Sequence, residues 1–203
     1  MRATLTIALK EFRGYFIAPM AYVVVLFFLG VSGLIFVLTM AMPQAATNHY
    51  RGVMQSMVFI TLMMAPVLTM SLLALERGRG TLELLMTRPV SDWSIVLGKY
   101  LAAVMIYTGL LIVTLLYPLL MSVGGEVEWG TILSGYVGMF CAGLAFMGIG
   151  LFGSAITADQ IAAALSAFFI LLFFWIMGFV AQSVPSGLGD VLNHLSFIEG
   201  YLE

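Results

Sequence analysis

The chain has 203 residues, of which 62% are hydrophobic and 9% are charged, and its mean hydropathy is +1.10. Charged residues make up about a quarter of an ordinary soluble domain, so this composition excludes a soluble globular protein and indicates an integral membrane protein. The formal net charge of -2 does not set the orientation, which depends on where Lys and Arg lie. With one cysteine, Cys141, and two widely separated histidines, we predict no disulfide and no metal site.

Residues 1–17 are predicted to form an interfacial amphipathic helix at the membrane surface. Four apolar residues share one side of this helix: Leu5, Leu9, Phe12 and Phe16. The charged residues lie elsewhere around it: Arg2, Lys10, Glu11 and Arg13. Ile7 and Tyr15 blur these faces, so the alternative is that the segment is the start of the first span.

Five segments are long and apolar enough to cross a bilayer, which takes about 20 residues of helix. They are residues 19–42, 53–75, 100–121, 131–156 and 160–182. We therefore predict an all-α polytopic bundle. These limits contain no Asp, Glu, Lys or Arg, which argues against an ion-coupled carrier. Pro66 and Pro118 fall inside spans and are candidates for helix kinks.

The basic residues set the predicted topology. Seven of the eight lie before the first span or in the segment 76–99, and Arg51 alone lies in the loop between the first two spans. Because cytoplasmic loops carry the excess of Lys and Arg, we expect the N-terminus and residues 76–99 to be cytoplasmic. Residues 183–203 are then external, and they carry no Lys or Arg.

The polar segment 76–99 is predicted to contain a short cytoplasmic helix over residues 81–87. Gly78 and Gly80 are expected to end the preceding helix, Thr81 to cap the new one, and Pro89 to end it. Its apolar residues Leu82, Leu84, Leu85 and Met86 would suit a groove on a soluble partner. Ser91 and Asp92 are placed to cap the helix that follows. The alternative is a solvated loop that only joins two spans.

This segment also carries a family resemblance. Its sequence includes Glu76, Arg77, Gly80, Thr81, Leu82, Glu83, Leu84 and Leu85, followed by Arg88, Pro89, Val90 and Ser91, and then Gly98 and Lys99. In these residues and in the order of its spans, the chain resembles ABC-2 type transporter permeases, particularly the small ones of gliding-motility-associated export systems. The family has six spans with both ends cytoplasmic, whereas this sequence has five.

The resemblance implies a permease subunit of an ATP-driven exporter in a bacterial or archaeal inner membrane. It implies an ABC ATPase partner that binds the ATP and magnesium, a second copy or related permease, contact with membrane lipid, and no nucleic acid. The sequence has no P-loop motif, since Gly98-Lys99 lacks the upstream glycine and precedes Tyr100. The resemblance also implies ten residues that couple the permease to the ATPase: Glu76, Arg77, Gly80, Thr81, Leu82, Glu83, Leu84, Leu85, Arg88 and Pro89. Glu76 would fix the coupling helix, and Arg88 and Lys99 would contact acidic groups or phospholipid. A non-transporting membrane scaffold is the alternative function.

The fourth span is rich in small residues at four-residue intervals. One row consists of Ser134, Gly138 and Ala142, and the other of Gly150, Ser154 and Ala158. Such spacing lets helix backbones approach closely in lipid. We predict that these residues pack against other helices of the bundle, and dimerisation through this face is the alternative.

Overall fold

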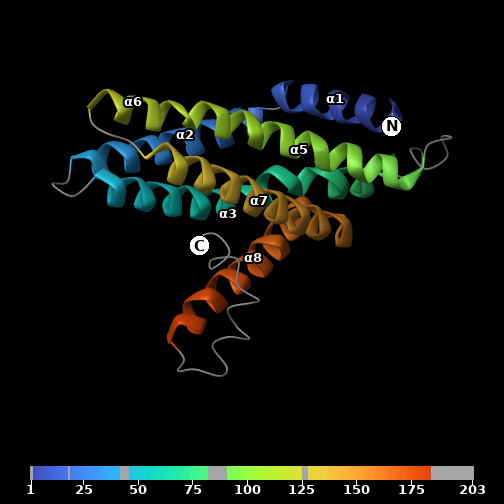
Figure 1. Cartoon of the computed structure of the whole chain (residues 1–203). Helices are drawn as coiled ribbons and strands as arrows, with labels where there is room; N and C mark the ends of the chain where they lie inside the picture. Colours follow the sequence, from blue (N-terminus) through green and yellow to red (C-terminus); the bar gives the residue numbers. More distant parts are fainter. Residues whose placement is uncertain (1, 18, 42–45, 82–90, 125–127, 184–203) are drawn as a thin grey trace.

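The computed structural model describes residues 2–17, 19–41, 46–81, 91–124 and 128–183 (Figure 1). Over these ranges the chain is helical and has no strand. The helices are α1 (Arg2–Ile17), α2 (Pro19–Met40), α3 (Ala46–Gly78), α5 (Asp92–Thr114), α6 (Leu116–Gly124), α7 (Trp129–Ile156) and α8 (Gln160–Ser183). The predicted all-α fold of a polytopic membrane protein is confirmed.

Five helical stretches in the described part are long and apolar enough to cross a membrane. They are Ala21–Met40, Arg51–Gly78, Asp92–Val123, Trp129–Ile156 and Gln160–Gly178, in the order of the five predicted spans. Helices α3 and α5 extend beyond the predicted span limits of 53–75 and 100–121 and include charged residues such as Glu76 and Lys99. Ion pairs between helices hold these charges, as described below.

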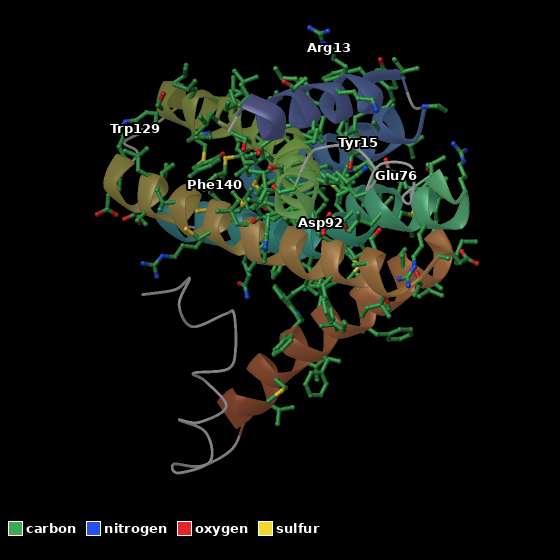
Figure 2. All side chains as sticks on the ribbon, turned by 90° about the vertical axis from the view of Figure 1, so that its right-hand side faces the viewer. Arg13, Tyr15, Glu76, Asp92, Trp129 and Phe140 are labelled. Atoms are coloured by element: carbon green, nitrogen blue, oxygen red, sulfur yellow. The ribbon has the colours of Figure 1, made fainter. Side chains whose placement is uncertain are left out.

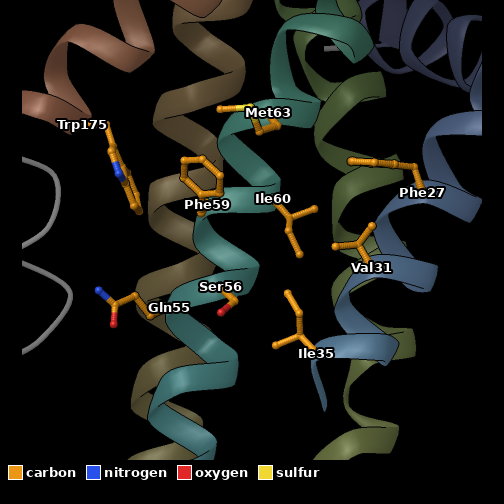
Figure 3. Close-up of a pocket in the computed structure, with 9 residues that line it drawn as sticks. All are labelled: Phe27, Val31, Ile35, Gln55, Ser56, Phe59, Ile60, Met63 and Trp175. Atoms are coloured by element: carbon orange, nitrogen blue, oxygen red, sulfur yellow. The ribbon is translucent and has the colours of Figure 1, made fainter. Parts of the chain in front are cut away.

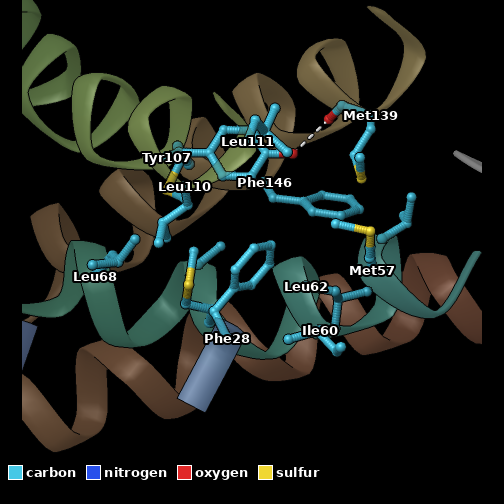
Figure 4. Close-up of a cluster of buried hydrophobic side chains, with 14 of the residues drawn as sticks. Phe28, Met57, Ile60, Leu62, Leu68, Tyr107, Leu110, Leu111, Met139 and Phe146 are labelled. Carbon is cyan, nitrogen blue, oxygen red and sulfur yellow. Dashed lines mark hydrogen bonds between the residues drawn. The ribbon is translucent and has the colours of Figure 1, made fainter. Parts of the chain in front are cut away.

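The core of the bundle lies around α3, which packs against α2, α5, α7 and α8. Figure 4 shows buried side chains that meet between α3, α5 and α7. Tyr107 of α5 is fully buried among them and donates its hydroxyl hydrogen to the backbone oxygen of Met139 on α7 at 2.7 Å. Gly143 of α7 makes room for the Tyr107 ring, which a Cβ at that position would overlap. These contacts fix α5 against α7.

The third span is built from two helices, α5 and α6, which are separated at Leu115. Pro118 has no backbone N–H, so the carbonyl of Thr114 four residues earlier lacks its usual helical donor. The Thr114 hydroxyl separately donates to the carbonyl of Leu111 at 2.8 Å, which leaves the Thr114 carbonyl without that donor. Pro66 lies inside α3, which continues through it. The helix is therefore broken near Pro118 and unbroken at Pro66.

Helices α1 and α8 lie at the edges of the bundle. Helix α1 lies against α5, and α8 leaves the end of α7 at a wide angle (Figure 1). On α1, Leu5 and Phe16 are 62% and 54% exposed, whereas Phe12 and Tyr15 pack on the core. Arg13 projects away from the bundle (Figure 2). The apolar face predicted for this helix is thus divided between protein and surroundings, and its interfacial position stays a prediction.

Candidate functional site

Three charged side chains from three helices meet at one end of the bundle. Lys99 lies near the start of α5, Glu76 in the last turn of α3, and Glu11 on α1. The Lys99 Nζ atom is 2.8 Å from Glu76 Oε1 and 3.2 Å from Glu11 Oε1. Lys99 is only 1% exposed. We call Glu11, Glu76 and Lys99 the charge cluster. It ties α1, α3 and α5 together at a single ammonium group.

Close approach of α1 to α5 buries Lys99. A Cβ on Gly98, the residue before it, would lie 2.8 Å from the Ile7 Cγ2 atom and 3.0 Å from the Thr4 carbonyl oxygen. These distances are too short for any larger side chain without movement of α1. Glycine at position 98 therefore lets α1 cover the lysine.

Tyr15 adds a second link between α1 and the bundle. Its hydroxyl donates to the Leu68 carbonyl oxygen of α3 at 2.6 Å. Burial raises the pKa of the Tyr15 hydroxyl above its usual value, and the nearby Glu11 carboxylate raises it further. The neutral, hydrogen-bonded form is thus the stable one at ordinary pH.

The charge cluster contains two carboxylates and one ammonium group. Glu76 Oε1 accepts from Lys99, but Glu76 Oε2 is buried and has no hydrogen-bond partner in the part of the chain that the structure describes. A buried carboxylate oxygen is costly without a donor. Glu76 Oε2 is therefore a hydrogen-bond acceptor without a donor among the described residues, and it lies next to the point where α3 ends.

The end of α3 is held tightly to the end of α7. Arg77 Nη1 donates to the Ala155 carbonyl oxygen at 2.7 Å and to that of Ile156 at 3.4 Å. A cation at this position also stabilises the negative end of the α7 dipole. Gly78 lies so close that a Cβ would be 2.6 Å from the Ala158 carbonyl oxygen. The two helix ends are thus joined through backbone contacts.

The predicted end of this helix is confirmed, since α3 ends at Gly78 and Gly80 has a positive φ of 68°. Such a backbone conformation favours glycine. Thr81 donates its hydroxyl hydrogen to the Glu76 carbonyl oxygen at 3.2 Å. The helix that Thr81 is predicted to cap lies outside the described residues, so this capping role stays a prediction. The last carbonyls of a helix lack intrahelical donors, and the Thr81 hydroxyl supplies one.

Several predicted coupling residues lie outside the described residues. They are Leu82, Glu83, Leu84, Leu85, Arg88 and Pro89. Where the chain is described again, Ser91 is the N-cap of α5, although its side chain makes no capping hydrogen bond, and Asp92 lies in the first turn. Lys99 contacts acidic groups, as expected, and both of them belong to this chain. Its ammonium group is covered and is already paired with two carboxylates of the same chain.

The sequence predicted neither the ion pair of Glu11 nor the hydrogen bonds of Ser154, although Ser154 was predicted to pack against another helix. Glu11 was placed on the polar side of α1, yet it faces Lys99. Ser154 of α7 is fully buried, and its Oγ accepts from the backbone N–H groups of Leu73 and Ala74 at 3.1 and 3.0 Å. The same hydroxyl donates to the Met70 carbonyl oxygen at 2.9 Å. The four-residue spacing of small residues was the available signal for Ser154, but it gave no indication of hydrogen bonding.

The small residues of α7 do not share one environment. Gly150 is buried against Thr69 of α3, where a Cβ would overlap the threonine side chain. Gly138 and Ala142 are half-buried, and Ser134 is exposed. The close contact between α3 and α7 is thus made by the half of α7 that leads to the charge cluster.

The fold and this site define the class of the protein. It is a multi-pass helical membrane protein with a paired charge cluster at one end. Residues 5–200 match the family described as ABC-2 family transporter protein. The chain therefore belongs to this family and is a membrane permease of the ABC-2 type. Comparisons with curated proteins and with solved structures gave no match. The resemblance to gliding-motility export permeases is not tested by this family match and stays a prediction.

Proposed function

We propose that the chain is the membrane-spanning subunit of an ATP-driven ABC-2 exporter and that a separate ABC ATPase drives it. Membership of the family supports this function, and the sequence has no P-loop of its own. A second copy or a related permease completes the membrane part, with lipid around it. The ATP and magnesium belong to the ATPase subunit.

One observation carries the mechanism: Glu76 and Lys99, the two ends of the segment 76–99, form an ion pair at 2.8 Å. A partner that binds this segment therefore acts on two spanning helices joined at their ends. Glu11 extends the connection to α1, and the bonds of Arg77 extend it to the end of α7. Movement of the segment would therefore displace α1, α3, α5 and α7 together and would not be confined to one loop.

The distribution of charge supports a cytoplasmic position for this end. Arg77, Arg79 and Lys99 lie here, together with the basic residues of α1, which packs beside the start of α5. Arg51 is near the other end of α3. Under the positive-inside rule, the charge cluster faces the cytoplasm, and the ATPase meets the permease there. In a bacterium or an archaeon, the membrane that borders the cytoplasm is the inner membrane, and we place the protein there.

The first experiment is to isolate the full chain from its own membrane and identify the proteins that accompany it in near-stoichiometric amount. We expect an ATPase with a P-loop. Its ATPase rate is then measured with the parent permease and with Glu76→Gln, which keeps the shape of the side chain and weakens its pairing with Lys99. We expect the variant to retain the ATPase but to lose most of the change in rate that the parent permease causes.

Glu128→Gln is the matched control, because this exposed carboxylate precedes α7 at the other end of the bundle. It should behave like the parent. Absence of any ATPase from intact, folded protein would contradict the proposal. An ATPase that binds but whose rate never depends on the permease would favour a membrane scaffold instead.

A further inference from the structure

A pocket of about 540 Å³ lies on the side of the bundle away from the charge cluster, between α2 and α3. Figure 3 shows its walls, which are aliphatic and aromatic apart from Gln55 and Ser56 of α3. Trp175 of α8 lines one side, with its ring centroid 5.4 Å from that of Phe59. The pocket is an apolar groove with two polar groups on one helix.

Helix α3 sets the depth of this pocket in the membrane. Arg51 and Glu76 are 25 positions apart, which is about 37 Å along a helix that rises 1.5 Å per residue. This length places both charges in the two headgroup layers of a bilayer with a hydrocarbon core of about 30 Å. Gln55 then lies about 6 Å deeper than Arg51, Phe59 about 12 Å and Met63 about 18 Å. The pocket runs from the headgroup boundary into the hydrocarbon.

The polar groups of the pocket have free hydrogen-bonding capacity. Ser56 donates to the Gly52 carbonyl oxygen at 2.8 Å, which leaves its own oxygen able to accept. The Gln55 amide is exposed and makes no hydrogen bond within the described residues. An amide at the edge of the hydrocarbon is costly unless a ligand supplies a partner.

The path from Arg51 to the pocket is open within the part of the chain that the structure describes. A Cβ on Gly52 would meet no atom within 4 Å, and Arg51 is exposed. In the described part of this end, the other charged residue is Glu128, which is exposed and forms no ion pair that would neutralise Arg51. With increasing depth in the membrane, the order is thus the Arg51 cation, the Gln55 amide and the apolar groove.

We propose that this pocket binds one acyl chain of an anionic phospholipid from the leaflet at the Arg51 end. The phosphate pairs with Arg51, an ester carbonyl accepts a hydrogen bond from the Gln55 amide, and the chain lies along Phe59 and Trp175. The charge of Arg51 selects an anionic headgroup over a zwitterionic one, and the bilayer itself supplies the ligand. This site does not depend on an ATPase partner.

Fluorescence quenching of Trp175 tests the site. The surface residues Trp93 and Trp129, which are 76% and 44% exposed, are changed to Phe so that Trp175 is the single reporter. The full chain is reconstituted in zwitterionic vesicles that contain a small fraction of phosphatidylglycerol or phosphatidylcholine with brominated acyl chains. We expect half-maximal quenching at an about fivefold lower fraction of the anionic lipid, as one basic residue near the surface provides.

The variant Arg51→Gln should remove this preference, and Gln55→Leu should weaken quenching by both lipids. Arg79→Gln is the matched control, because it removes the same charge from the exposed surface at the other end and should leave the preference unchanged. Equal quenching by both lipids in the parent, or a preference that survives Arg51→Gln, would overturn the proposal. Quenching by neither lipid would mean that protein, such as a second copy of the chain, covers the pocket, and would also overturn it.

Discussion

Replacement of Lys99 by methionine tests the charge cluster most directly. The substitution keeps a long side chain in place of a residue that is 1% exposed, but it removes the partner of both Glu11 and Glu76. Loss of one member of a buried ion pair costs about 3–5 kcal/mol. Each carboxylate side chain is still 25% exposed, so water screens part of the penalty. We therefore expect a loss of about 2–3 kcal/mol in the free energy of unfolding.

For a protein of this size, that loss lowers the thermal midpoint by about 4–12 °C. The assay is thermal unfolding of the purified chain in a mild detergent, followed through a double-mutant cycle with Glu76→Gln. The double variant should lose about 1–2 kcal/mol less than the sum of the single variants, because it leaves one unpaired carboxylate, Glu11, where Lys99→Met alone leaves two. Arg79→Gln on the exposed surface should change stability by less than about 0.5 kcal/mol. Additive effects, or a Lys99→Met variant as stable as Arg79→Gln, would refute the reasoning.

Three further substitutions test other contacts by the same thermal assay. Gly78→Ala should cost about 1–3 kcal/mol, because its Cβ would lie 2.6 Å from a backbone oxygen of Ala158 that has little freedom to move; an unchanged midpoint would mean that the two helix ends separate easily. Ser154→Ala should cost about 1–3 kcal/mol through loss of three hydrogen bonds to α3, and a neutral result would show that α3 satisfies its own backbone there. The raised pKa of Tyr15 favours the folded state with a neutral hydroxyl, so its stabilising effect is complete below about pH 10 and is lost as the pH rises further. Tyr15→Phe should therefore show a smaller loss of stability between pH 9 and 11 than the parent does, and equal losses would contradict the assignment.

The spans and the end of α3 could be predicted because they depend on local sequence. An apolar run of about 20 residues has few stable alternatives in a membrane. Gly78 and Gly80 ended the helix as expected, since glycine readily adopts the positive φ observed at position 80. Similarly, the break near Pro118 follows from a missing backbone donor within the same helix.

The charge cluster could not be predicted because it depends on contacts far apart in the sequence. Glu11 and Lys99 are 88 positions apart. Their contact requires the close approach of α1 that Gly98 allows, and nothing in the local pattern of α5 indicates which helix will cover it. The sequence predicted that Lys99 contacts acidic groups or phospholipid, but it did not indicate that the acidic groups would be Glu11 and Glu76 or that packing would bury the lysine between helices.

The spacing of small residues in α7 identified a pattern but not a single face. Each step of four residues turns about 40° beyond a full turn of an α-helix. Over the 20 positions from Ser134 to Ser154, this drift reaches about 200°, so the two serines face nearly opposite directions. This explains why Ser134 is exposed while Ser154 lies in the contact with α3.

The order of the charge cluster along the chain has a consequence for how the protein is made. Glu11 and Glu76 both precede Lys99 in the sequence. Synthesis proceeds from the N-terminus, so both carboxylates have left the ribosome before the lysine does. When α5 enters the membrane, its ammonium group meets two acceptors that are already present. Biogenesis in this order spares Lys99 a period as an unpaired cation at the edge of the lipid.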